Sequence, residues 1–270
     1  MLNNFSRTTF GSTGTEISRL GISGTYRPGK KAIHKAVDEG VNFFFCYGFD
    51  GQMISTLREV IKSGREKYVI ATGAYNLILG HPNLRRTLEK RLRQLGTDYL
   101  DVFLYLGVMK EKQYPESIKE EFCKFREEGK VGTIGLSCHD RKFAGRLAAE
   151  GILNSFMIRY NAAHRGAEQD IFPYLSAHNP GLISYTATRW RYLLRRPKIW
   201  PKEERIPTVP MCYRFVLSNP NVDVCLMAPY NEKQLTENLS VLRDGPLPED
   251  DMAFMRKFGD VVHRTKKYFM

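Results

Sequence analysis

Apolar and polar positions follow two alternating patterns along the chain. Short apolar runs rich in β-branched and aromatic residues are separated by longer segments whose apolar residues recur every three or four positions. The short runs predict strands at Leu20–Gly24, Val41–Cys46, Tyr68–Thr72, Tyr99–Tyr105, Gly132–Ser137, Ser155–Arg159, Gly181–Tyr185 and Val222–Met227. The longer segments predict helices at Lys30–Glu39, Met53–Lys62, Asn83–Leu95, Pro115–Glu128, Arg141–Glu150, Glu168–Ser176, Val209–Ser218, Glu232–Leu242 and Met252–Arg264.

Glycines mark several of the predicted helix ends. Gly40, Gly64, Gly96 and Gly129 each follow a helical segment closely, in the position that a helix C-terminus favours. The alternation of strands and helices is therefore supported by end signals as well as by periodicity.

Eight strand–helix units predict one architecture. Alternating βα units form parallel sheets with helical crossovers, and eight of them close into a (β/α)8 TIM barrel. An open doubly wound sheet would use five or six strands and carry a glycine fingerprint after its first strand. Gly21 and Gly24 provide only a weak version of that fingerprint. We therefore predict an α/β protein with a single barrel.

The two ends of the chain add to the barrel. Thr8–Phe10 and Thr15–Ser18, around Gly11 and Gly14, predict a β-hairpin across the barrel floor. Met252–Arg264 predicts an extra C-terminal helix. The strand–helix units leave no residues for another unit, so we expect residues 1–270 to form a single domain.

The composition is that of an ordinary globular protein. Hydrophobic residues make up 42% and charged residues 26% of the 270 positions, which excludes a disordered chain. No apolar run approaches the roughly 20 residues of a membrane span, and Met1–Ser6 lacks a signal-peptide core. The five cysteines form no CxxC pair. We expect a cytoplasmic protein with no disulfide framework, no metal site and no membrane partner.

The net charge of +12 favours anionic partners. The densest basic segment contains Arg189, Arg191, Arg195, Arg196, Lys198 and Lys202, with Trp190 and Trp200 between them. No helix-turn-helix, zinc-finger or aromatic RNA-binding signature accompanies it. We interpret the segment as a solvated loop and expect no nucleic-acid partner.

Several segments, in order and spacing, resemble the aldo-keto reductase family. They are Gly40–Phe44, Val69–Thr72, Leu88–Leu92, Leu95–Asp101, Gly129–Val131, Ile134–Ser137, Tyr160-Asn161, Gln234-Leu235 and Glu237-Asn238. The resemblance implies a (β/α)8 barrel and carbonyl reduction by a nicotinamide cofactor, usually NADPH. It runs from about Thr8 to Leu242.

The same resemblance implies that the family's catalytic tetrad is replaced. With Asn42 and Gly51 as anchors, the family's aspartate position holds Phe45 and its tyrosine position holds Asp50. The lysine and histidine positions hold Gly73 and Leu106. Phe45, Gly73 and Leu106 carry no group that can donate a proton to an alkoxide.

The implied cofactor residues are only partly present. Ser137, Tyr185, Thr186, Glu237 and Asn238 match positions that bind the dinucleotide, with Tyr185 as the ring that stacks on the nicotinamide. An asparagine and a glutamine that hold the carboxamide in the family are Cys138 and Met157 here, and the 2′-phosphate positions are Ala228 and Gln234. NADP or NAD is therefore an expected cofactor with weakened phosphate recognition. Glu237 and Asn238 are equally consistent with plain helix-surface residues.

An alternative is a rebuilt reductase site. Tyr47 lies two residues after Phe45, so strand periodicity points both side chains the same way, and Asp50 is in the same loop. Tyr47 would then supply the proton, although no cation lowers the pKa of its phenol. A shift in register would instead place Tyr47-Gly48 on the family's Tyr-Gly pair, but the Gly51 register suits the following helix better. A further candidate is a Cys138 thiolate beside His139, while buried Cys46 and Cys138 acting as small hydrophobes is the commoner arrangement.

Basic residues follow the later strands. His139 and Arg141 follow the fifth, Arg159, His164 and Arg165 lie at and after the sixth, and Arg189 and Arg191 follow the seventh. Guanidinium groups bind carboxylates and phosphates through charge-assisted hydrogen bonds. We expect His139, Arg159 and His164, with Arg189 and the face of Tyr185, to bind an anionic small molecule at the barrel mouth. Arg165 and Glu168 are also placed to form an ion pair at a helix start.

Three interpretations follow. The chain is interpreted first as an aldo-keto-reductase-like protein that binds a dinucleotide or another anionic small molecule, with reductase activity lost or altered. The second interpretation is an NAD(P)H-dependent oxidoreductase that uses Tyr47 and Asp50. The third is an enzyme of different chemistry, such as a lyase or isomerase, that uses the Arg/His rim. The sequence specifies neither the physiological ligand, nor a protein partner, nor the oligomeric state.

Overall fold

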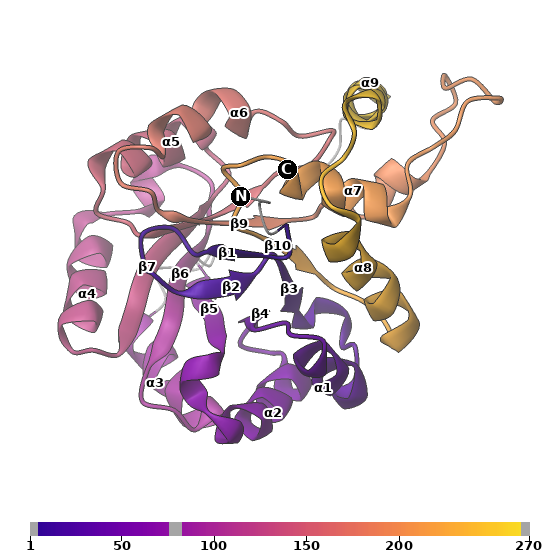
Figure 1. Cartoon of the computed structure of the whole chain (residues 1–270). Coiled ribbons are helices and arrows are strands. Elements are labelled where there is room, and N and C mark those ends of the chain that lie inside the picture. The colour runs from indigo at the N-terminus through magenta and orange to yellow at the C-terminus, as the bar shows by residue number, and fades with distance from the viewer. Residues whose placement is uncertain (1–4, 76–82, 266–270) are drawn as a thin grey trace.

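A computed structural model describes residues 5–75 and 83–265 of the chain. Within these residues, eight parallel strands close a barrel in the order β10-β3-β4-β5-β6-β7-β8-β9 (Figure 1). The barrel strands are β3 (Leu20–Ser23), β4 (Phe43–Phe45), β5 (Val69–Tyr75), β6 (Leu100–Val108), β7 (Val131–Cys138), β8 (Ser155–Arg159), β9 (Gly181–Tyr185) and β10 (Val224–Met227). The predicted (β/α)8 barrel is confirmed.

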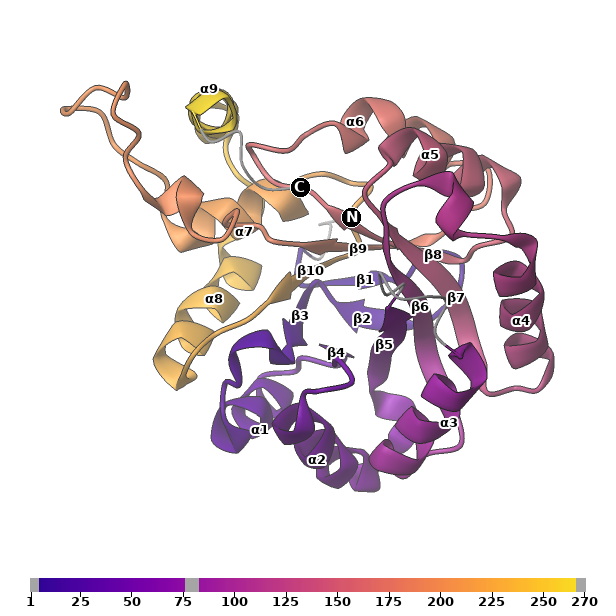
Figure 2. The same cartoon turned by 180° about the vertical axis from the view of Figure 1, so that it is seen from behind.

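Helices surround this barrel (Figures 1 and 2). They are α1 (Lys30–Asp38), α2 (Gly51–Val60), α3 (Leu84–Leu95), α4 (Glu116–Glu127), α5 (Arg141–Glu150), α6 (Ala167–Asp170), α7 (Val209–Leu217), α8 (Glu232–Asp244) and α9 (Glu249–Thr265). Side-chain caps explain several starts: Asn83, Asp140 and Asn231 each accept a hydrogen bond from a backbone N–H three residues on. Gly96 ends α3 with φ of 71°, as its position in the sequence predicts.

The N-terminal hairpin closes the barrel floor. β1 (Arg7–Thr9) pairs antiparallel with β2 (Glu16–Ser18), and Figure 1 looks onto this end of the barrel. Phe10 follows β1 and is buried among the inward-facing side chains, with its ring centroid 5.6 Å from that of Phe43. The hairpin therefore plugs the amino-terminal end and leaves the carboxyl ends of the strands for ligands.

Side chains divide into two apolar clusters according to strand periodicity. The inner cluster fills the barrel and includes Phe45, Leu106 and Met157, with Tyr47 and Tyr185 packed against it. The outer cluster lies between strands and helices. Because alternate residues of a strand face opposite sides, inward-facing positions continue past the inner cluster to the residues at the barrel mouth.

One predicted helix is wrong. The segment Glu168–Ser176 forms only the four-residue α6 and then the separate 3-10 turn Phe172–Tyr174. Pro173 lacks a backbone N–H and its ring clashes with the preceding turn, so the helix cannot continue through it. The apolar periodicity of this segment reflects burial of Ile171, Phe172 and Leu175 instead.

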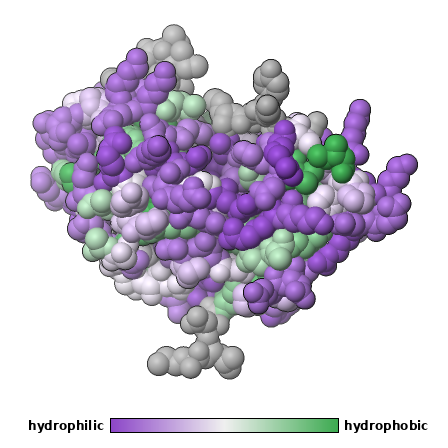
Figure 3. All heavy atoms as spheres, turned by 90° about the horizontal axis from the view of Figure 1, so that it is seen from above, coloured by the Kyte–Doolittle hydropathy of each residue, from purple (hydrophilic) through white to green (hydrophobic). Residues whose placement is uncertain are grey.

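The segment between the 3-10 turn Tyr192–Leu194 and α7 extends away from the barrel beside α9 (Figure 2). Seen from the side that carries α9, the surface is mainly hydrophilic, with small separate hydrophobic groups (Figure 3). Across the described ranges, none of the helices has the length and apolar character needed to cross a bilayer.

Candidate functional site

A cavity lined largely by aromatic rings opens at the carboxyl ends of the strands. It has a volume of about 390 Å³ and lies between the segments that follow β3, β4, β9 and β10 and one face of α8. Aromatic rings form much of its wall: Tyr26, Tyr47, Tyr185, Trp190, Tyr213 and Tyr230. We call it the aromatic cleft. Its volume is in the range of small-molecule and cofactor sites.

Tyr185 ends β9 on the inward face and packs against the inner cluster. Burial raises the pKa of its phenol, although the Arg159 charge and a hydrogen bond with the Ser137 side chain oppose the shift. The phenol therefore stays protonated and the ring is held in place. The family resemblance assigns both Ser137 and Tyr185 to the cofactor site, and their side chains are in hydrogen-bond contact.

The segment after Tyr185 has an unusual backbone. Thr186, Arg189, Trp190 and Arg191 all have positive φ, between 48° and 69°. Non-glycine residues in this region cost of order 1 kcal/mol or more each and cluster where a ligand is clamped. Thr186, Trp190 and Arg191 line the aromatic cleft, so the strained segment forms one of its walls.

Glu237 and Asn238 belong to the cleft. Both lie on α8 and line the cavity, and Asn238 is only 4% exposed. The cap at Asn231 fixes the start of α8, and Gln234 also faces the cleft. Asn238 is therefore not the plain helix-surface residue that remained possible from the sequence.

The cleft also contains a stacked pair of tyrosine rings that was not predicted from the sequence. Tyr26, after β3, stacks on Tyr230, after β10, with centroids 4.5 Å apart and planes 27° apart. Both line the aromatic cleft. Their positions just after two adjacent strands were the available signal, because such residues meet at the same end of the barrel.

Tyr47 also faces the cleft. Its ring stacks on those of Phe49, at 5.2 Å and 3°, and Tyr75, at 5.8 Å and 18°. Burial raises the pKa of its phenol, and hydrogen bonds with Tyr75 and Thr25 only partly offset this effect. A raised pKa makes Tyr47 a weaker proton donor than a free tyrosine.

Asp50 lies outside the lining of the aromatic cleft. It is 4% exposed, and its Oδ2 accepts a hydrogen bond of 2.8 Å from the backbone N–H of Tyr47. Burial raises its pKa, against the opposing charges of Arg27 and Arg91. The carboxyl group thus fixes the loop that carries Tyr47. The contact between the two residues is made by the Tyr47 backbone N–H and not by its phenol.

Below these rings, the barrel interior is apolar at three of the positions that the family resemblance assigns to the catalytic tetrad. Phe45 and Leu106 belong to the inner cluster and are 0% and 3% exposed. Gly73 is inward-facing on β5 between them, and a Cβ atom added there would lie 2.2 Å from the Leu104 carbonyl oxygen. Only glycine fits this close approach of two strands.

His139, Arg159 and His164 meet in a separate small cavity. It has a volume of about 20 Å³ and is also lined by Cys138, Arg141 and Ile171. None of its lining residues lines the aromatic cleft. We call it the basic cavity. The expected basic rim is therefore a site beside the cleft, with Arg159 paired in register to Tyr185 at the boundary.

The basic cavity opposes protonation of its own histidines. Burial and the Arg159 charge lower the pKa of His139. Burial, followed by the charges of Arg159 and Arg189, lowers the pKa of His164 to about 3. Both imidazoles are neutral at pH 7 and can each offer one N–H donor.

Arg189 differs from the solvated residue expected of a basic loop. It is 2% exposed, and its Nη1 donates a hydrogen bond of 2.7 Å to the Val262 carbonyl on α9. Trp200 in the same basic segment is 4% exposed and packs on Phe258. The part of the segment near α9 is thus a docking surface for that helix.

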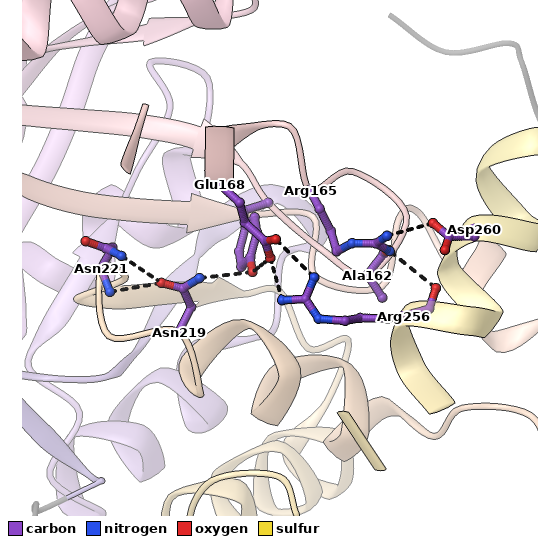
Figure 4. Close-up of polar contacts among 8 residues, drawn as sticks. Ala162, Arg165, Glu168, Asn219, Asn221, Arg256 and Asp260 are labelled. Atoms are coloured by element: carbon purple, nitrogen blue, oxygen red, sulfur yellow. Dashed lines mark hydrogen bonds and ion pairs between the residues drawn. The ribbon is translucent and has the colours of Figure 1, made fainter. Parts of the chain in front are cut away.

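The expected Arg165–Glu168 ion pair is also replaced by contacts with α9 (Figure 4). Arg165 Nη2 donates to Asp260 at 2.7 Å, and Arg256 binds both carboxylate oxygens of Glu168 at 2.8 and 3.0 Å. Glu168 accepts a further hydrogen bond from the Tyr160 hydroxyl at 2.6 Å. These contacts hold α9 against the loop that carries His164.

Cys138 is not an activated thiol. It is 5% exposed, its Sγ donates to the Asp140 carbonyl at 3.2 Å, and burial raises its pKa to about 12. A thiolate pair with His139 is therefore disfavoured. Cys46, which is fully buried with a pKa raised to about 11, is likewise a small core residue. Among the residues with described positions, no cluster of three His, Cys, Asp or Glu side chains could hold a metal ion.

Comparisons with known proteins agree with the barrel fold. The model of the Aldo/keto reductase family matches residues 24–196. This is more than half of the chain, which therefore belongs to the aldo/keto reductase family. Among curated relatives, "Probable aldo-keto reductase 1" of Glycine max is 26% identical over 65% of this chain and 57% of its own length. A Mycobacterium aldo-keto reductase is 26% identical over 46% of this chain and 47% of its own length, so the chain spans about half of these relatives.

Solved structures share the fold. The holo form of an aldo-keto reductase from Bacillus halodurans superimposes with a TM-score of 0.78 at 17% identity, over 94% of this chain and 96% of its own. An aldo/keto reductase from Klebsiella pneumoniae, solved with NADP and acetate, gives 0.77 at 20% identity, over 94% and 95%. Another Klebsiella structure, in complex with NADPH, gives 0.76 at 19% identity, over 98% and 99%.

Proposed function

We propose that this chain is a nicotinamide-dinucleotide-binding member of the aldo/keto reductase family in which carbonyl reduction by the family mechanism is lost or strongly reduced. One observation carries the binding half of the proposal. Tyr185, Thr186, Glu237 and Asn238, which come from two distant parts of the chain, line one continuous cleft. The NADP- and NADPH-bound neighbours support it, because they share this fold.

The loss of reduction is proposed from the barrel interior. Hydride transfer to a carbonyl leaves an alkoxide that needs a proton donor. The family resemblance assigns the tetrad positions to Phe45, Asp50, Gly73 and Leu106. Phe45 and Leu106 are packed apolar side chains, Gly73 has no side chain, and Asp50 holds a backbone N–H instead of facing the cleft.

Binding of a dinucleotide is tested by titrating the purified protein with NADPH and NADH. We expect saturable binding of at least one, and no strong preference for NADPH because Ala228 and Gln234 carry no charge for a 2′-phosphate. A dinucleotide at a hundred times its dissociation constant should stabilise the fold by about 2.7 kcal/mol, which a thermal shift detects.

Two tyrosine variants make the test specific. Tyr185→Ala should weaken dinucleotide binding about tenfold, because it removes the stacking ring. Tyr174→Ala is the matched control, since Tyr174 is 47% exposed and lines neither cavity. Equal binding by all three proteins, or no binding by the parent, contradicts the proposal.

A second candidate is a reductase in which Tyr47 donates the proton. The specific observation in its favour is that Tyr47 and Tyr185 line the same cleft. Aldehyde-dependent NADPH oxidation that Tyr47→Phe abolishes would establish this candidate and overturn the loss of activity. If Tyr47→Phe leaves a slow rate unchanged, Tyr47 is a wall of the cleft only.

We also propose a reducing, cytoplasmic location. All five cysteines are free thiols, and Cys46, Cys138, Cys212 and Cys225 are buried. Free buried thiols are typical of proteins that fold in a reducing compartment. Fluorescence microscopy of a tagged chain tests this location.

A further inference from the structure

The basic cavity brings several arginine and histidine side chains together at one point of the fold. Arg159 projects from the end of β8, His139 from the residue after β7, and His164 from the loop between β8 and α6. All three line the same small cavity, and Arg141 at the start of α5 lines it as well. Two successive βα units, β7/α5 and β8/α6, therefore converge on one point.

Carboxylates near this cavity are already engaged by other guanidinium groups. Asp170 accepts from Arg141 Nε at 2.9 Å, Glu168 is bound by Arg256, and Asp260 by Arg165. No carboxylate lines the basic cavity within the described residues. The positive charge of Arg159 is thus left without an acidic partner there.

Two polar atoms in the cavity lining have no hydrogen-bond partner among the residues that the structure describes. Arg159 Nη1 and His164 Nε2 are each buried and make no hydrogen bond to any part of the chain that the structure describes. An unsatisfied buried donor costs about 1–3 kcal/mol, and more when it is charged. Buried polar groups in natural proteins are usually satisfied, so a water, an ion or a polar group of a ligand is expected to bind here.

The dimensions of the site limit what it can hold. A cavity of about 20 Å³ admits one or two water-sized groups. It adjoins an open outer pocket of about 420 Å³, and Arg141, His164 and Gly166 line both. One or two oxygen atoms of a carboxylate or phosphate group would fit inside, while the rest of the ligand would occupy the outer pocket against α9.

We propose that His139, Arg159 and His164 form a binding site for the carboxylate or phosphate group of a small molecule, separate from the aromatic cleft. Arg159 supplies the charge and a guanidinium fork, which matches the two oxygens of such a group. The two neutral imidazoles supply N–H donors. The net charge of +12 attracts anions to the surface, and the cavity concentrates that attraction at one point.

Calorimetry on the full chain tests the proposal with two probe anions. Sulfate represents the tetrahedral phosphate group, and acetate represents the carboxylate. We expect saturable binding of at least one, and the stronger of the two identifies the class of ligand. Absence of saturable binding for both overturns the proposal.

Variants locate the binding. Arg159→Gln and His164→Gln should each weaken binding of the preferred anion, Arg159→Gln by roughly 30-fold, because a buried charged contact is lost. Arg146→Gln is the matched control, since Arg146 lies on the outer side of α5, pairs with Glu111 and lines neither cavity. Equal anion affinity in all four proteins would overturn the site.

A competition experiment separates this site from the proposed function. Anion binding should persist at saturating NADPH, and anion binding that NADPH abolishes would place the anion in the aromatic cleft and overturn the separate site. If the protein binds no dinucleotide at all, the sulfate and acetate titrations still decide the basic cavity. Thermal unfolding of each variant confirms that it is folded, and His164→Gln retains the charge of Arg159 if Arg159→Gln fails to fold.

Discussion

The aromatic cleft and the basic cavity share one end of the barrel but use opposite means of recognition. The cleft is wide and lined by rings and hydroxyl groups, with Arg191 and Glu237 as its charged residues. The basic cavity is small, and four of its lining residues are arginine or histidine. Arg159 and Tyr185 are directly paired across β8 and β9. Each strand contributes its own terminal side chain. Two adjacent strand ends can therefore offer an aromatic ring to the cleft and a guanidinium group to the basic cavity.

The largest expected effect concerns the rate of carbonyl reduction in the aromatic cleft. If the aromatic cleft binds a dinucleotide without the family's proton donor, carbonyl reduction should be slower by a factor of about 10²–10⁴ than in a relative that has it. The measurement is NADPH oxidation with common aldehydes under identical conditions. A rate within tenfold of that relative would contradict the prediction.

The barrel interior beneath the cleft should be intolerant of a side chain at Gly73. Gly73→Ala places a Cβ against the Leu104 carbonyl and is expected to destabilise the fold by about 1–3 kcal/mol. Gly51→Ala is the control, because nothing lies within 4 Å of its Cβ position and alanine favours the helix there. Denaturant unfolding of both variants tests this, and equal stability would contradict it.

The basic cavity should make stability depend on pH. The folded state lowers the pKa of His164 to about 3, against about 6.5 when unfolded. Between these two pKa values, His164 is protonated in the unfolded chain and neutral in the folded chain. The free energy of unfolding should therefore fall by roughly 1–2 kcal/mol as the pH drops from 7 to 4. Burial of His164 is the largest cause of the lowered pKa, followed by the charges of Arg159 on β8, Arg189 after β9, His263 on α9 and Arg141 on α5.

Two histidine variants isolate this contribution. His164→Gln should reduce the loss of stability at low pH. His178→Gln, at an exposed histidine that lines neither cavity, should retain it. Unfolding free energies measured at several pH values decide between them, and parallel pH profiles for the parent and His164→Gln would refute the assignment.

The smallest expected effect concerns the ring pair of the cleft. Tyr26→Ala removes the stack on Tyr230 and should weaken dinucleotide binding about two- to tenfold. A fluorescence titration measures the change, with Tyr174→Ala again as control. No change in Tyr26→Ala would show that the pair is outside the bound ligand's reach.

The sequence predicts the barrel because its signals are local. The strands Ser155–Arg159 and Gly181–Tyr185 match the structure at both ends, and Gly96 ends α3 as expected. The grouping of Tyr185 with Glu237 also follows from a family pattern. Periodicity over a few residues and strand-end placement are enough for these features.

What the sequence does not predict depends on contacts between distant segments. Arg165 and Glu168 look like partners at a spacing of three, but α9 brings Asp260 and Arg256 closer. Arg189 looks solvated until the same helix covers it. The separation of the basic residues from the cleft likewise depends on side-chain directions that one residue of register would reverse.

The backbone at Gly73 also limits which single substitutions the barrel can accept. The resemblance places the family's lysine at this position, yet the neighbouring strand now lies too close for any side chain to be accommodated. A lysine introduced alone at position 73 would meet the Leu104 carbonyl and the Leu106 side chain before it reached the cleft. Any side chain at position 73 therefore requires coordinated changes on β5 and β6, which move the two strands apart.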